Sequence, residues 1–65
     1  MGRYEEAVDA NEKALQLRPD LPDAHHALGL AHLKLGNKAA ALAQCRLLAP
    51  LDSDKARELR DEIGA

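Results

Sequence analysis

Two histidines and one cysteine are the residues of this sequence best suited to chemistry. His25 and His32 are seven positions apart, a spacing that places both side chains on one side of a helix. Two imidazoles and the thiolate of Cys45, the single cysteine of the chain, are suitable zinc ligands, with water or a carboxylate in the fourth position. A simpler interpretation is that the histidines are core side chains satisfied by hydrogen bonds, because their spacing matches no compact zinc motif.

The same histidines also suggest a response to pH. Rings that are buried in the neutral form would weaken the packing around them when acid protonates them. A small helical module that responds to metal or pH through His25, His32 and Cys45 is therefore an alternative hypothesis for the function. An unfolding midpoint that stays constant between neutral and mildly acidic pH would exclude the pH response.

No motif for catalysis is present. The sequence lacks a glycine-rich phosphate loop, a nucleophile elbow and the helix motif of zinc proteases. The adjacent carboxylates of Glu5 and Glu6, and of Asp61 and Glu62, point in different directions on a helix and read as solvated charge. We therefore predict that the protein is not an enzyme and that it uses no cofactor.

Composition predicts an all-α fold. The chain has 65 residues, 46% of them hydrophobic and 31% charged, far from the composition of disordered proteins. The hydrophobic share is mostly Ala and Leu, which favour helices, whereas residues that favour strands are scarce. The net charge of −2 with mixed signs indicates no nucleic-acid partner. The lack of a long apolar run indicates no membrane span, and the single cysteine leads us to expect a cytoplasmic location.

Proline, glycine and polar residues divide the chain into about four helices. We predict helices at 3–17, 22–35, 38–48 and 54–63. Pro22 suits the first turn of the second helix, and Gly36 suits the left-handed position after its end. Asn37 can cap the third helix, which ends before Pro50. Asp52 and Ser53 can cap the fourth helix.

The chain repeats itself with a period of 34. At that shift Gly2 aligns with Gly36, and Ala7 aligns with Ala41, so two copies of one unit are present. With Leu28-Gly29, His32 and Cys45 at matching spacings, the chain resembles the tetratricopeptide repeat family from Gly2 to about Asp54. The resemblance implies helix-turn-helix repeats of an α-solenoid with a concave groove. In one module spanning 1–65, residues 3–17 would be the second helix of a partial repeat, 22–49 one hairpin and 53–63 a cap.

The resemblance also assigns structural roles to particular residues. It puts Gly29 and Ala41 where the paired helices come closest, and it puts Cys45 on the side of the third helix that faces the second. Small residues permit a close approach, so Gly29→Leu should destabilise the fold more than Lys34→Leu. His25, His32 and Cys45 stand where the family carries large or aromatic side chains.

The resemblance implies a peptide-binding groove as the default site. Seven residues would line it: Asp23, His26, Leu30, Leu33, Lys34, Arg57 and Arg60. Some family members clamp a carboxylate with Lys and Asn side chains, but the matching positions here do not carry them. Arg57 and Arg60 leave an acidic peptide open as the partner, although solvated charges on the cap are the simpler interpretation. A peptide or partner helix is the expected ligand.

The first helix lacks the partner with which the resemblance would pair it. Its stripe packs partly on the second helix, and a self-association surface is predicted at Tyr4, Val8, Asn11 and Leu15. Three explanations stay open: the chain is a segment of a longer array, it self-associates as a homo-oligomer, or it is a small capped monomer. In each case we expect a protein–protein interaction scaffold.

Overall fold

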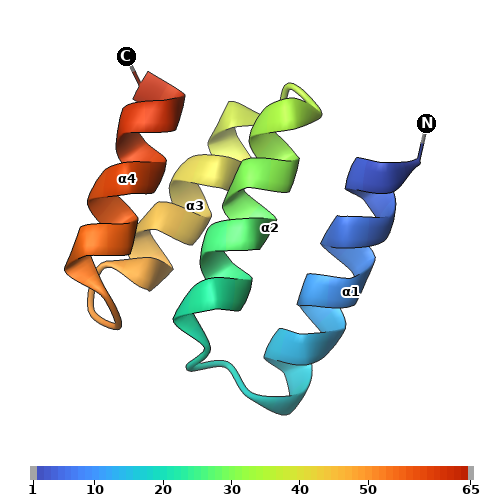
Figure 1. Cartoon of the computed structure of the whole chain (residues 1–65), viewed down its shortest axis with the longest axis horizontal. Helices are drawn as coiled ribbons and strands as arrows, with labels where there is room; N and C mark the ends of the chain where they lie inside the picture. Colours follow the sequence, from blue (N-terminus) through green and yellow to red (C-terminus); the bar gives the residue numbers. More distant parts are fainter. Residues whose placement is uncertain (1, 65) are drawn as a thin grey trace.

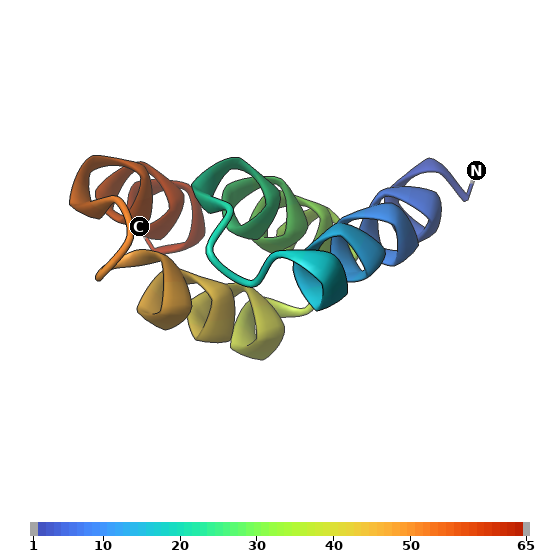
Figure 2. The same ribbon diagram turned by 90° about the horizontal axis from the view of Figure 1, so that it is seen from below.

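The computed structural model describes residues 2–64, and within them four α-helices and no strand are present. The helices run alternately up and down in chain order (Figure 1). α2 and α4 lie side by side in one layer, α3 lies in a second layer, and α1 lies on the side of α2 away from α4 (Figure 2). The all-α prediction is therefore confirmed, while Met1 and Ala65, the ends of the predicted module, lie outside the described residues. The bounds are α1 (Arg3–Leu17), α2 (Pro22–Lys34), α3 (Lys38–Leu48) and α4 (Ser53–Gly64).

The turn between α2 and α3 follows from two residues. Gly36 has a φ of 80°, in the left-handed region that glycine adopts without steric cost. Its amide donates to the Leu33 carbonyl at 3.0 Å, and the next amide, of Asn37, donates to the His32 carbonyl at 2.8 Å. This pair of bonds satisfies carbonyls at the end of α2. The Asn37 side chain then accepts from the Ala40 amide at 3.2 Å and caps α3.

The other helix ends agree with the predictions to within one residue. Pro22 begins α2, where a missing amide proton costs nothing. α2 ends at Lys34, one residue before the predicted end, because Leu35 already departs from helical dihedrals. The Asp52 carboxylate accepts from the Lys55 amide at 3.1 Å, so Asp52 caps α4 and Ser53 is its first residue.

The core lies mainly between α3 and α4. α4 presents one apolar stripe on an otherwise charged helix, and all three residues of that stripe are buried. Leu30 and Leu33 of α2 are partly buried and pack against the cluster. α4 thus covers the end of the α2/α3 hairpin, as a cap does in a repeat array. The cluster consists of Ala41, Cys45, Leu48, Ala56, Leu59 and Ile63.

The close approach at Gly29 is to α4 rather than to α3. A Cβ atom on Gly29 would meet Cδ2 of Leu59 first and would lie 3.0 Å from Cδ1 and 3.3 Å from Cγ of the same side chain, which is fully buried. The atoms nearest to this position belong to the cap helix, whereas the resemblance placed the close approach within the hairpin. The glycine instead lets α4 lie close beside α2.

The repeat period is broken between α3 and α4. α2 and α4 begin 31 positions apart, at Pro22 and Ser53, rather than 34. The cause is Pro50, which aligns with Gln16 inside α1 at the period of 34. Proline is not tolerated in a helix interior, so α3 ends earlier than α1 does. Three residues correspond to about 300° of helical rotation, so at an offset of 31 the residues of α4 that face α2 differ from those expected at the period of 34.

Candidate functional site

A groove between α2 and α4 is the first candidate site. Its volume is about 450 Å³. Leu30 is half-buried at its base, and the rest of the lining is polar or charged. We call it the α2/α4 groove, and it is lined by His26, Leu30, Lys34, Glu58, Asp61 and Glu62.

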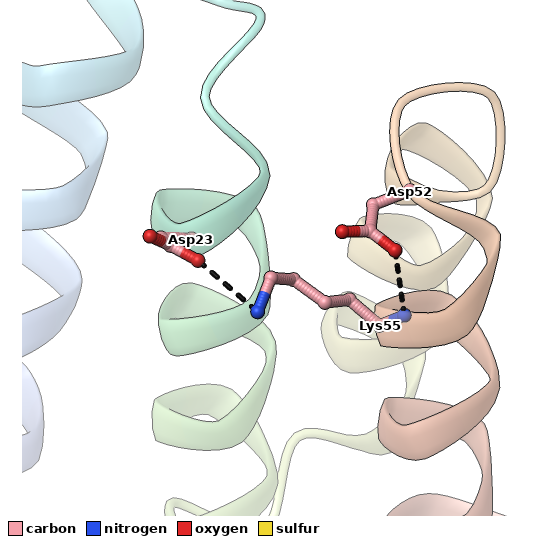
Figure 3. Close-up of polar contacts among 3 residues, drawn as sticks. All are labelled: Asp23, Asp52 and Lys55. Atoms are coloured by element: carbon pink, nitrogen blue, oxygen red, sulfur yellow. Dashed lines mark hydrogen bonds and ion pairs between the residues drawn. The ribbon is translucent and has the colours of Figure 1, made fainter.

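An ion pair joins α2 and α4 near their N-terminal ends (Figure 3). The Lys55 ammonium lies 3.2 Å from a carboxylate oxygen of Asp23. The hydrogen bond and charge of Asp23 raise the pKa of Lys55 above its ordinary value of 10.5. The Asp23 side chain is 92% exposed, so water screens the pair and its contribution to stability is small. Asp23 thus lies beside Lys55 of α4, and its carboxylate stays exposed to solvent.

The structure divides the residues that were predicted to line one groove. His26, Leu30 and Lys34 line the α2/α4 groove, whereas Leu33 packs against the core cluster. Arg57 and Arg60 line a different hollow, between α3 and α4. The predicted placement of the two arginines was wrong because the rotation of α4 carries them away from α2.

The groove residues predicted from the sequence did not include three acidic residues that line the α2/α4 groove. Glu58, Asp61 and Glu62 face the groove from α4. These residues lie at the groove because α3 ends early, so the proline at position 50 was the sequence signal that could have predicted them. With these acids and without the arginines, the groove has a negative wall.

His25 is held by two hydrogen bonds in the core. Its side chain is buried, its Nε2 lies 2.8 Å from the Pro19 carbonyl oxygen, and its Nδ1 lies 2.7 Å from the Gln44 amide oxygen. The ring therefore links the α1–α2 turn to α3. Because an amide can offer either its oxygen or its NH₂ group, Gln44 can partner the ring in both protonation states.

Cys45 is also engaged in the core. Its thiol donates to the Ala56 carbonyl at 3.1 Å, which joins α3 to α4, and the side chain is buried. Among residues 2–64, no group of three His, Cys, Asp or Glu side chains could hold a metal ion. The structure therefore does not bring His25, His32 and Cys45 together as ligands. His25 and Cys45 act as hydrogen-bonded core residues, and His32 is half-buried on α2.

α1 is the least buried helix. It contacts α2 and no other helix in the described part of the chain, and none of its residues is buried. Val8, Asn11 and Leu15, predicted for self-association, are partly covered. Tyr4 is 48% exposed. One part of the apolar face of α1 therefore contacts α2, and the rest is exposed to solvent.

The four antiparallel helices in two layers, with a cap on the last hairpin, define the chain as a helical-repeat protein. A family model described as TPR repeat matches residues 1–36, and one described as tetratricopeptide repeat matches residues 22–57. The first covers more than half of the chain, so the chain belongs to the tetratricopeptide repeat family. Searches of curated proteins and of solved structures found no match.

Members of this family are generally non-enzymatic modules for protein–protein interaction. Over the part of the chain that is described, no helix is long and apolar enough to cross a membrane.

Proposed function

We propose that this chain is a protein–protein interaction scaffold that binds a peptide or partner segment along the α2/α4 groove. The observation that carries the proposal is the composition of that groove. Its base is apolar at Leu30, and three carboxylates of α4 form one wall. All three carboxylates are exposed. Side chains that the fold does not bury are free to contact a partner.

The charges of the groove favour a basic partner over an acidic one. The lining contains three acidic residues, Glu58, Asp61 and Glu62. Its only residues that can carry a positive charge are His26 and Lys34. Complementary charge speeds encounter and excludes partners of like charge. We therefore infer a segment in which an apolar side chain contacts Leu30 and flanking Lys or Arg side chains contact α4. This replaces the acidic peptide that the sequence left open.

Fluorescence anisotropy with two short labelled peptides tests the proposal. Both peptides carry a central leucine, flanked by lysines in one and by glutamates in the other. We expect the basic peptide to bind and the acidic peptide not to bind. Added salt should weaken the binding because the groove is open to solvent.

A matched pair of variants assigns the binding to the groove. Glu58→Gln with Glu62→Gln removes two charges from α4, and Glu5→Gln with Glu6→Gln removes the same two charges from exposed positions of α1. The first variant should bind the basic peptide roughly tenfold more weakly. Equal loss in both variants would mean that net charge alone attracts the peptide, and the proposal would then fail.

A further inference from the structure

A second groove lies between α3 and α4, on a different surface from the α2/α4 groove. Its volume is about 450 Å³. Half of its lining residues are apolar, three are arginines and none is acidic. We call it the α3/α4 groove, and it is lined by Leu42, Cys45, Arg46, Ala49, Ser53, Ala56, Arg57 and Arg60.

Residues of the α3/α4 groove correspond by repeat register to residues of α1 and α2 that lie beside α3. α3 packs against α2, and a hollow along its side is lined by Glu12 and Leu15 of α1 and by His25 of α2. At the period of 34, Glu12 aligns with Arg46 and Leu15 with Ala49. At the offset of 31 between the starts of α2 and α4, His25 aligns with Ala56. The α3/α4 groove therefore lies where a further helix of the α3 type would pack.

α1 is a helix of the α3 type with an uncovered face. Ala7, Asn11 and Ala14 align with Ala41, Cys45 and Leu48 at the period of 34, and the α3 residues of these pairs are buried. Their α1 counterparts are only half-buried. Beside them Ala10 is exposed and Leu17 is 85% exposed. α1 thus carries a stripe of small side chains suited to close packing on another helix.

The charges of α1 and of the α3/α4 groove are complementary. α1 contains four acidic residues and two basic ones, while the groove carries Arg46, Arg57 and Arg60. From register and charge together we propose that α1 of a second copy of this chain binds in the α3/α4 groove. There it would complete, with α4, a hairpin of the same kind as α2 and α3.

This contact is head-to-tail, because the surface on one copy differs from the surface on the next. Such contacts do not close into a dimer unless their rotation closes a ring, so assembly continues as concentration rises. The α2/α4 groove takes no part in it. Peptide binding and assembly are therefore measured separately, and either can fail without the other.

The register predicts one specific neighbour across the contact. Ala10 aligns with Gln44, which lies in the same hollow as Glu12, and Glu12 aligns with Arg46. Ala10 of the incoming helix should therefore lie beside Arg46 of the receiving copy. Ala10→Glu should then strengthen assembly and Ala10→Arg should weaken it, each by roughly tenfold in the dissociation constant. Ala43, also exposed on a helix but outside both grooves, provides Ala43→Glu and Ala43→Arg as controls.

Light scattering coupled to size exclusion, over a range of concentrations, measures the assembly. Wild type should gain mass beyond a dimer as concentration increases. Ala10→Arg, and separately Arg57→Glu with Arg60→Glu, should each stay monomeric at concentrations where wild type has already gained mass. A mixture of these two variants in equal amounts should form one defined heterodimer, because only one competent contact remains. Circular dichroism verifies that each variant is folded. If a variant designed to prevent assembly does not fold, Ala10→Glu still tests the proposal, because it should strengthen assembly.

Three outcomes would overturn the proposal. Wild type could stay monomeric at every concentration. The variant with Arg57→Glu and Arg60→Glu could still dimerise alone, which would indicate a symmetric contact between two α1 helices. Both charges at Ala10 could act in the same direction, which would place Arg46 away from that residue.

Discussion

The contact between Gly29 and Leu59 can be tested by adding a single methyl group. Gly29→Ala places a Cβ atom against Cδ2 of Leu59, and 3.0 Å from Cδ1 and 3.3 Å from Cγ of the same side chain. Carbon atoms are most stable at about 3.5–4.0 Å. Because Leu59 is fully buried, its side chain has little room to move away, and α4 would have to shift.

Two effects of opposite sign set the magnitude. Replacing a helical glycine by alanine stabilises by about 1 kcal/mol, whereas overpacking a core costs about 1–3 kcal/mol. In the wild-type background we therefore expect Gly29→Ala to lower the free energy of unfolding by about 0–2 kcal/mol. In a Leu59→Ala background the methyl group has space, and the same change should raise the free energy of unfolding by about 1 kcal/mol. The coupling between the two positions is then about 1–3 kcal/mol.

Urea unfolding of the four proteins, followed by far-ultraviolet circular dichroism, measures this coupling. Leu59→Ala alone costs about 2–5 kcal/mol, so all samples should contain the same concentration of a stabilising osmolyte. Lys34→Leu, at an exposed position of the same helix, is the control and should change little. If Gly29→Ala stabilises by the same amount in both backgrounds, the methyl group does not meet Leu59 and the packing of α4 on α2 is wrong.

Three further predictions concern hydrogen bonds and charge. Asn37→Ala removes the side-chain cap of α3 and should lower the free energy of unfolding by about 1 kcal/mol in urea titrations; an unchanged midpoint would contradict the cap. His25→Phe keeps the ring but loses both ring hydrogen bonds, so it should cost about 1–3 kcal/mol, and equal stability would show that these bonds contribute nothing. The pKa of Lys55 is raised in the folded state by Asp23, so the pair stabilises fully below the ordinary lysine pKa of 10.5. That stabilisation disappears as pH rises through the raised value. NMR titration should give Lys55 a lower pKa in Asp23→Asn, and an identical pKa would refute the pairing.

Local chemistry was enough to predict the helices. Pro22, Gly36 and Asn37 act on their own backbone through a missing donor, a left-handed φ and a short side-chain acceptor. Such effects depend on neighbours in sequence, so the bounds of α1 and α3 agree with prediction. α2 differs from its prediction by one residue at its end, and α4 differs by one residue at each end. The repeat period and the small residues likewise pointed to the family.

Contacts between helices required the tertiary structure. The sequence alone determined that α4 carries Arg57 and Arg60 on one side and Glu58 and Glu62 on another, but not which side meets α2. That choice depends on the rotation of α4 about its axis, which Pro50 changes by ending α3 early. For the same reason, the neighbour of Gly29 became known only once the helices were packed, because a helix with a small residue can approach either of two partners.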